Sequence, residues 1–555
     1  MNKKVCSFPI LFALLALLIG TCAVVFPASA QAAPTSTGSI TVSGTVASSY
    51  DAYQIFSANV VDGDSDAKIA TDLAWASDAV RDAALPVLHS AGMPNSQTTA
   101  QEAAEWLNTD SHLTSALSAQ LARSLQSSGA VSVALNAGTE AELPCGYWLI
   151  VADDDAIAQG EVGTAPIMAL VGGSAVTVKP KAATPKVSKH VLEDSTDAWQ
   201  KAADATVADD LYWRLSATVP AGLTAYDTYT VQLVDTMSAG LDPSKVAASM
   251  RVYVAAGADG GFDAVQIGKD GRAGTEPAKG WTDITAQCAT KVAADGTFTV
   301  RTGDLIAALG GADAFAAGAR VVAVYNAPLN SACNHGIAKG NPNEVYLRYP
   351  RSPFADQSGD AGFTRTPSDD ACAYTWDLAL TKRSSDGDKP LAGAVLSIAD
   401  DRGRTLAADG TWDAEGKATV TTGEDGRVTV SGVDSGKLEV RELKAPKGYA
   451  AFEGMRSVTV KAEGLDVDQV AAAKPKLTIT AESPLRADSA DGSTGSLEAS
   501  LINTPTGTPP SITTGGFMPS TGDMAMYAAA AAAVAGAALI VVALLVKRGG
   551  GSHKE

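Results

Sequence analysis

Residues 438–449 read Leu-Glu-Val-Arg-Glu-Leu-Lys-Ala-Pro-Lys-Gly-Tyr. In a β-strand, alternate side chains share a face, so Leu438, Val440 and Glu442 would point to one side. Glu442 therefore continues an apolar row and is predicted to face a core. Because a carboxyl group is rarely buried without a partner, this stretch predicts a strand whose inward glutamate needs a polar neighbour.

Two further apolar rows around this stretch also end in a polar side chain. One row ends at Lys382 and the other at Asn503; the rows are Trp376, Leu378, Leu380, Lys382 and Leu497, Ala499, Leu501, Asn503. We place Lys382, Glu442 and Asn503 on the first, penultimate and last strands of one unit. The simpler interpretation is that each lies at a strand end and reaches water. Their joint occurrence favours a buried cluster.

Such a cluster permits an intramolecular amide bond. Burial lowers the pKa of a lysine and raises that of a glutamate, which favours the neutral forms. Neutral Lys382 would attack the Asn503 amide, while protonated Glu442 would bond to that amide and polarise its carbonyl. Ammonia would leave, and folding would hold the reacting groups together. The event occurs once per molecule, so the chain is not predicted to be an enzyme.

The stretch Val440–Tyr449 resembles the E-box of sortase-assembled pilins, although Leu443 stands where threonine is usual. The unit at 373–504 is therefore similar to a Cna-B-type domain of a backbone pilin. Its short strands are separated by turn signals, as in β-sandwiches. The resemblance implies that Lys382 and Asn503 form the crosslink and that Glu442 assists.

The unit at 181–372 repeats this pattern with an aspartate. Its rows are Val187, Lys189, Val191; Val231, Leu233, Asp235; and Asn343, Val345, Leu347. Segments 185–189, 234–241 and 340–343 resemble a fimbrial isopeptide-forming D2-type domain. We assign Lys189 as nucleophile, Asp235 as proton donor and Asn343 as acceptor. Asn341 has the same parity and remains an alternative acceptor.

The unit at 33–180 is predicted to be a β-rich domain with inserted helices. Strands are expected at Ser39–Val46, Tyr147–Val151 and Ala175–Val178. A helix is expected from about Ser111 to Ser127, because leucines recur every fourth residue at Leu113, Leu117, Leu121 and Leu125. No constellation comparable to the two lysine clusters is predicted in this unit.

The end of the first unit presents lysines outward. Val176, Val178 and Pro180 align on one side and leave Lys179 and Lys181 on the other. The stretch 176–181 resembles the pilin motif whose lysine attacks a sortase acyl-enzyme. This implies Lys181 as the intersubunit nucleophile, with Lys179 as the fallback. A solvated basic linker is the alternative.

The N-terminus carries a candidate export signal and the C-terminus a candidate sorting signal. Residues 1–32 have two lysines, an apolar stretch and small-x-small sites, as in a signal peptide. After a Pro-, Gly- and Thr-rich stalk at 505–517, the segment 518–555 contains an apolar run at 524–546, long enough for a transmembrane helix, and a basic tail. The motif before the run is Met518, Pro519, Ser520, Thr521 and Gly522. It resembles the LPXTG sorting signal, which implies sortase cleavage after Thr521. The alternative is an ordinary single-span membrane protein.

Composition narrows the possible partners and cofactors. A net charge of −19 and a pI near 4.7 argue against nucleic acid as a partner. We find no motif for a metal, a cofactor or a catalytic triad. The expected extracellular setting permits disulfides, but the sequence does not choose among three pairings of Cys145, Cys288, Cys333 and Cys372.

Together these features predict a mainly β chain of tandem Ig-like or Cna-type sandwiches with a C-terminal transmembrane helix. The resemblances imply a wall-anchored pilus shaft subunit. Its partners would be pilus-specific and housekeeping sortases, peptidoglycan, and other copies joined through Lys181 and Thr521. The alternative is an ancillary pilin or a monomeric adhesin that binds a host ligand.

Overall fold

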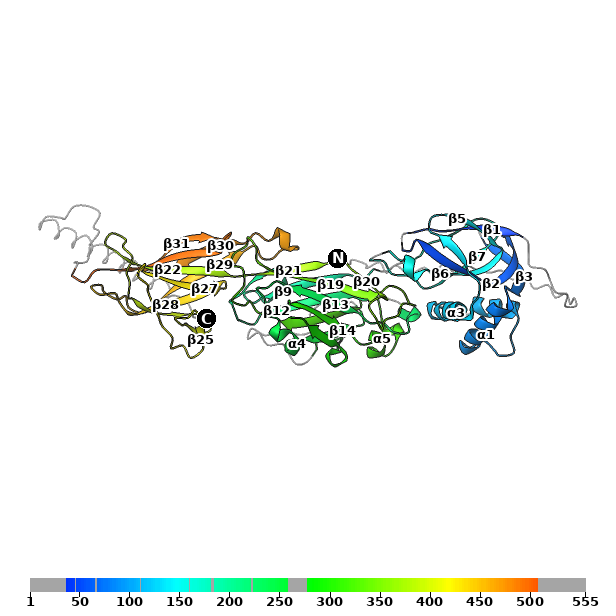
Figure 1. The fold of residues 1–555 in the computed structure, drawn as a ribbon, viewed down its shortest axis with the longest axis horizontal. Helices are drawn as coiled ribbons and strands as arrows, with labels where there is room; N and C mark the ends of the chain where they lie inside the picture. The colour runs from blue at the N-terminus through cyan, green and yellow to red at the C-terminus, as the bar shows by residue number, and fades with distance from the viewer. Residues whose placement is uncertain are drawn as a thin grey trace, which may run out of the picture.

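The computed structural model describes residues 36–507, with gaps at 45, 65–66, 110, 159, 181–183, 221–222 and 258–276. The described residues are mainly β and form three domains in a row, which confirms the predicted fold class (Figure 1). The expected signal peptide, sorting signal and C-terminal helix lie outside them. Within the described part, no helix is both long and apolar enough to cross a membrane.

The first domain contains two sheets, with strand orders β5-β1-β8 and β3-β2-β6-β7, and β4 pairs with β2. The predicted strands near 147 and 175 are β6 and β8. The first strand ends at Val42 and not at Val46, because Gly44 turns the chain with a φ of 128°. The bounds are β1 Thr37–Val42, β2 Ser49–Asp62, β3 Lys68–Trp75, β4 Val133–Asn136, β5 Glu140–Pro144, β6 Gly146–Ala152, β7 Ile167–Val171 and β8 Val176–Val178.

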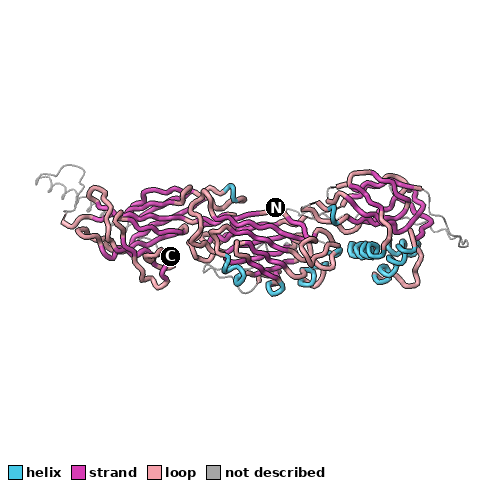
Figure 2. Tube along the Cα trace, in the orientation of Figure 1, coloured by secondary structure: helices cyan, strands magenta, loops and turns pink. Residues whose placement is uncertain are grey.

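Three helices gather beside the larger sheet of this domain (Figure 2). They are α1 Asp78–Ser90, α2 Ala100–Asn108 and α3 Ser115–Ser128. The predicted helix corresponds to α3, but it begins later, because the Thr114 side chain caps it by accepting a bond from the Leu117 amide. Leu113 thus precedes the helix and is 38% exposed, so its assignment to the apolar stripe was wrong. The other three leucines are buried.

The second domain is a sandwich of two sheets, ordered β10-β9-β12-β18-β14-β15 and β11-β21-β19-β13-β17-β16, with β20 on β19. Its last strand, β21, runs past residue 372 and ends at Tyr374. The bounds are β9 Val187–Glu193, β10 Ala198–Gln200, β11 Ala202–Asp204, β12 Tyr212–Thr218, β13 Gln232–Met237, α4 Val246–Ser249, β14 Arg251–Ala255, β15 Trp281–Asp283, β16 Ala289–Val292, β17 Thr297–Arg301, α5 Leu305–Ala308, β18 Arg320–Asn326, β19 Asn341–Pro350, β20 Phe363–Arg365 and β21 Asp369–Tyr374.

The third domain is a second sandwich, with sheets β27-β22-β32-β31 and β25-β24-β23-β28-β29-β30, and β26 on β23. Its first and last strands, β22 and β32, are parallel neighbours. The bounds are β22 Trp376–Ser384, β23 Val395–Ala399, β24 Thr405–Leu406, β25 Trp412–Asp413, β26 Val420–Thr421, β27 Arg427–Val433, β28 Gly436–Lys444, β29 Met455–Glu463, β30 Lys476–Ala481, β31 Leu485–Asp491 and β32 Ser496–Asn503.

The strand that carries Glu442, β28, is not the penultimate strand of this domain, so that prediction was wrong. Three strands, β29, β30 and β31, separate β28 from β32. Of these, β30 and β31 lie at sheet edges and bury few side chains. Edge strands with short apolar rows give a weak alternation signal, which is why the sequence did not reveal them.

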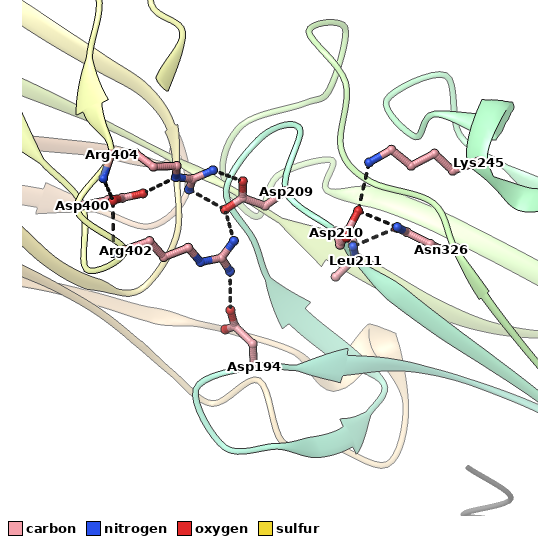
Figure 3. Close-up of polar contacts among 9 residues, drawn as sticks. All are labelled: Asp194, Asp209, Asp210, Leu211, Lys245, Asn326, Asp400, Arg402 and Arg404. Carbon is pink, nitrogen blue, oxygen red and sulfur yellow. Dashed lines mark hydrogen bonds and ion pairs between the residues drawn. The ribbon is translucent and has the colours of Figure 1, made fainter. Parts of the chain in front are cut away.

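Ion pairs join the second and third domains (Figure 3). Arg404 donates to both carboxylate oxygens of Asp209 and, through Nε, to Asp400 at 2.6 Å. Arg402 lies 3.1 Å from Asp209 and 3.7 Å from Asp194. The Asp209 side chain is only 12% exposed, so this network is better shielded from water than an ordinary surface pair. It restrains the two sandwiches relative to each other.

Candidate functional site

The second domain brings Lys189, Asp235 and Asn343 together, as the sequence predicted. Lys189 comes from β9, while Asp235 and Asn343 come from the neighbouring strands β13 and β19 of the opposite sheet. All three residues are 0% exposed. The cluster therefore lies between the two sheets, at a depth where unpaired charge is costly.

A tyrosine that the sequence analysis did not single out sits at the centre of this cluster. Tyr325, on β18, lies 2.9 Å through its hydroxyl from Lys189 Nζ and donates to Asp235 Oδ2 at 3.1 Å. Asn343 Nδ2 donates to the same hydroxyl at 2.8 Å, and Lys189 Nζ also bonds to Asp235 Oδ2. One feature could have pointed to Tyr325: it lies in a wholly buried strand, and a buried tyrosine hydroxyl usually has a hydrogen-bond partner.

Asn341, the alternative acceptor, lies outside the cluster. Its side chain accepts from the Asn334 amide at 2.8 Å and donates to the carbonyls of Asn334 at 2.9 Å and Ala373 at 3.2 Å. These bonds hold the loop before β19 against β21. The geometry thus leaves Asn343 as the asparagine that faces Lys189.

The surroundings favour the neutral forms of the reacting groups. Burial lowers the pKa of Lys189 to about 8, although Asp235 opposes the shift. Burial likewise raises the pKa of Asp235, and Lys189 opposes that shift. The backbone of Lys189 is fixed as well, since its amide donates to Asp369 at 2.6 Å and its carbonyl accepts from Lys201 at 2.9 Å. These contacts fix the position on β9 from which the lysine side chain enters the cluster.

The third domain brings Lys382, Glu442 and Asn503 together. They come from β22, β28 and β32 and are 0%, 6% and 2% exposed. Lys382 Nζ lies 3.5 Å from Glu442 Oε1 and donates to the Leu501 carbonyl at 3.3 Å. Burial lowers the pKa of Lys382 to about 8, with Glu442 opposing the shift.

The amide orientation differs from the one predicted. Glu442 accepts from Asn503 Nδ2 with Oε1 at 2.9 Å and Oε2 at 3.0 Å, so it contacts the nitrogen and not the carbonyl oxygen. Asn503 Oδ1 and Asn343 Oδ1 have no hydrogen-bond partner among the described residues. The acid therefore faces the atom that would leave, a geometry suited to protonating it. The predicted polarisation of the carbonyl by Glu442 is not what the structure shows.

Within each domain, the lysine and the asparagine of the cluster lie on differently related strands. Lys189 and Asn343 lie on opposite sheets of the second domain, whereas Lys382 and Asn503 lie on adjacent parallel strands of one sheet. A bond between the first pair would join two sheets. A bond between the second pair would join the first and last strands of the third domain.

The remaining predictions concern the intersubunit lysines, the sorting motif and the cysteines. Lys179 is exposed just after the buried Val178, in agreement with the outward assignment. Lys181 and the motif Met518–Gly522 lie outside the described residues. In the described ranges, no three His, Cys, Asp or Glu side chains are arranged to hold a metal ion. The four cysteines there are free thiols, so none of the possible disulfides is formed.

Part of the third domain matches a known protein family. Residues 377–474 match the family model of the SpaA prealbumin-like fold domain. This chain carries a SpaA prealbumin-like fold domain. A curated relative, the trypsin-resistant surface T6 protein of Streptococcus pyogenes serotype M6, is 31% identical over 134 residues. The match covers 23% of this chain and 23% of that protein. The chain is thus related to a streptococcal surface protein over about a quarter of the length of each.

The solved structures that align with this chain include three pilins, each with a TM-score below 0.5. The T6 backbone pilin of Streptococcus pyogenes is 17% identical with a TM-score of 0.45, and the alignment covers 85% of this chain and 98% of that one. SpaD of Corynebacterium diphtheriae is 16% identical with a TM-score of 0.40, with coverage of 85% and 98%. SpaA of the same species is 14% identical with a TM-score of 0.37, with coverage of 84% and 99%.

Proposed function

We propose that this chain is the shaft subunit of a covalent, sortase-polymerised pilus and that two internal Lys–Asn bonds stabilise it. The observation that carries the proposal is the pair of buried clusters in which a lysine, a carboxyl group and an asparagine meet within successive domains. The SpaA prealbumin-like domain and the relationship to the T6 protein support the same assignment. The role is structural, and the internal chemistry is a maturation step.

Each internal bond would form by the same exchange of atoms. Neutral lysine Nζ attacks the asparagine Cγ, and a new carbon–nitrogen bond replaces the bond to Nδ2. The lysine nitrogen loses one proton, and the departing nitrogen gains one and leaves as ammonia. The nearby neutral carboxyl group supplies the proton for the departing nitrogen and takes up the proton that the lysine nitrogen loses, so it ends unchanged. Preorganisation by the fold replaces an encounter in solution.

The third-domain bond suits a subunit that carries tension. The chain enters this domain at β22 and leaves it at β32, and Lys382 and Asn503 lie on these two strands. A covalent link between them lets force pass from entry to exit without loading the remaining hydrogen-bonded strands. Subunits built as the row of domains in Figure 1 would then form a filament that extends little under tension.

Polymerisation would use a lysine between the first and second domains and the threonine of the C-terminal motif. A sortase would cleave after Thr521 and transfer its acyl group to Lys181 of a second copy, with Lys179 as the fallback. A final transfer to peptidoglycan would anchor the polymer to the wall. The exposed Lys179 beside β8 supports this proposal, because this lysine faces solvent.

Wall extracts separated on denaturing gels test the proposed shaft role. In the native host, the wild-type chain should give a ladder of high-mass species, and Lys181→Ala should remove it. Lys186→Ala is the matched control, since Lys186 is an exposed lysine on the other side of the linker. A ladder that persists in Lys181→Ala and in the double variant with Lys179→Ala would contradict the shaft role and favour a monomeric adhesin or an ancillary pilin.

A further inference from the structure

The hydroxyl of Tyr325 touches every member of the second-domain cluster. It lies within 2.9 Å of Lys189 Nζ, 2.8 Å of Asn343 Nδ2 and 3.1 Å of Asp235 Oδ2. An amide Nδ2 can only donate, so the hydroxyl accepts from Asn343 and gives its own proton to Asp235. Tyr325 is thus in contact with both nitrogens that exchange places in the proposed reaction.

In the third domain, the acid contacts the asparagine directly, without a tyrosine between them. There, Glu442 contacts Asn503 Nδ2 directly with both carboxylate oxygens. Aspartate is one methylene shorter than glutamate, and no hydrogen bond joins Asp235 to Asn343 in the described structure. The path from Asp235 to Asn343 Nδ2 runs through the Tyr325 hydroxyl instead. The Tyr325 hydroxyl thus bridges Asp235 and Asn343, because it bonds to both.

We propose that Tyr325 is a further catalytic residue of the second-domain site, where it relays a proton between Asp235 and the departing nitrogen of Asn343. The inference rests on the proposed function, because it assumes that Lys189 and Asn343 become joined. In the second domain, Asp235 and Tyr325 together would transfer the proton that Glu442 would transfer alone in the third domain.

The relay balances in protons and bonds. Neutral Lys189 Nζ bonds to Asn343 Cγ while the Tyr325 hydroxyl protonates Nδ2, so the Cγ–Nδ2 bond breaks and ammonia leaves. Protonated Asp235 gives its proton to the phenolate oxygen. Nζ then gives up one proton to the Asp235 carboxylate, so both side chains end as they began. Burial raises the pKa of Tyr325, which keeps the phenol protonated before the reaction.

A purely packing role for Tyr325 is distinguishable from the relay. The ring packs edge to face on Phe298 with centroids 4.8 Å apart, and phenylalanine would preserve that contact. Tyr325→Phe therefore removes the hydroxyl and leaves the apolar part of the side chain. Protease resistance of the second domain reports whether the variant remains folded.

The test uses the full-length chain, pulse-labelled during synthesis and sampled at intervals. Denaturation, tryptic digestion and mass spectrometry then measure the fraction of joined Lys189–Asn343 peptides. We expect Tyr325→Phe to slow this bond by about 10²-fold or more. The Lys382–Asn503 bond in the same molecules should form at the wild-type rate. A folded Tyr325→Phe chain that joins Lys189 to Asn343 at the wild-type rate would overturn the relay.

A double variant separates the relay from any loss of folding. In Asp235→Glu with Tyr325→Phe, the longer acid occupies the space of the hydroxyl and reaches Asn343 directly, as Glu442 reaches Asn503. We expect this pair of substitutions to restore the bond, and a folded double variant without it would contradict the relay. If the wild-type chain lacks both bonds, the proposed function fails, a result distinct from failure of the relay alone.

Discussion

Glu442 holds the amide nitrogen of Asn503 between its two carboxylate oxygens, at 2.9 and 3.0 Å. The acid is also fixed from behind, because Oε2 accepts from the Phe452 amide at 3.1 Å. This arrangement places the carboxyl group against the nitrogen that would leave, with Lys382 Nζ 3.5 Å from Glu442 Oε1. Three strands are required to assemble it.

Replacing Glu442 by glutamine should stop the third-domain bond without removing the packing. The amide keeps the shape of the acid but cannot pass a proton, so we expect the rate of Lys382–Asn503 joining to fall by about 10²-fold or more. Peptide mass spectrometry measures the joined fraction over time. The Lys189–Asn343 bond is the internal control. Unchanged joining of Lys382 in Glu442→Gln would show that the acid has no chemical role.

The two candidate acceptors of the second domain should separate cleanly by substitution. Asn343→Ala should leave Lys189 unjoined, whereas Asn341→Ala should leave the bond intact. Asn341→Ala should still lower the free energy of unfolding by about 1–3 kcal/mol, because it strands buried backbone groups that Asn341 now satisfies. Peptide mapping and urea unfolding provide the two readouts. Loss of the bond in Asn341→Ala, with the fold retained, would reverse the assignment of the acceptor.

The alternation of side chains was enough to predict most of the two clusters. Lys382, Glu442 and Asn503 each end an apolar row, and strand geometry alone turns such a residue inward. The same argument identified Lys189 and Asp235. Local geometry determines these orientations, so a single sequence contains them.

Contacts between distant strands were not predictable in this way. Parity could not separate Asn341 from Asn343, since both face the same side of β19 and differ only in what lies opposite. Tyr325 comes from β18, which joins the cluster because of strand order and not because of any local pattern. The orientation of the Asn503 amide likewise depends on which atoms surround it after folding.

The low pKa of Lys382 predicts a pH-dependent stability once its acceptor is removed. In Asn503→Ala the amine stays free and buried, with a pKa of about 8 in the folded chain against an ordinary value of 10.5. Between these values the unfolded chain binds the proton and the folded chain does not. The free energy of unfolding should therefore rise with pH across this window, by at most about 1.4 kcal/mol per pH unit.

Urea unfolding of the third domain between pH 7.5 and 10 measures this slope. Lys382→Met combined with Asn503→Ala is the matched control, because it removes the titrating amine and keeps a long apolar side chain. The difference in slope between the two variants reports Lys382 alone. A difference of zero, or a fall in stability with rising pH, would contradict a lysine that folds into its site with a lowered pKa.

The Asp209–Arg404 pair should couple the second and third domains. Arg404→Ala leaves the largely buried Asp209 without its bidentate partner, so we expect the interface to weaken by about 1–3 kcal/mol. Hydrogen exchange of the amides near Asp209 should quicken, while exchange within the core of each sandwich should not. Lys417→Ala is the control, since its pair with Glu415 is exposed and should contribute little. Equal effects of both variants would show that the interface pair has no special role.

Mapping the covalent bonds of the mature wild-type chain tests whether the two internal Lys–Asn bonds form. The chain is denatured, digested and analysed by tandem mass spectrometry. We expect two branched peptides, one joining Lys189 to Asn343 and one joining Lys382 to Asn503, each lighter by one ammonia than the sum of its linear parts. Recovery of all four residues in linear, unmodified peptides would contradict this expectation.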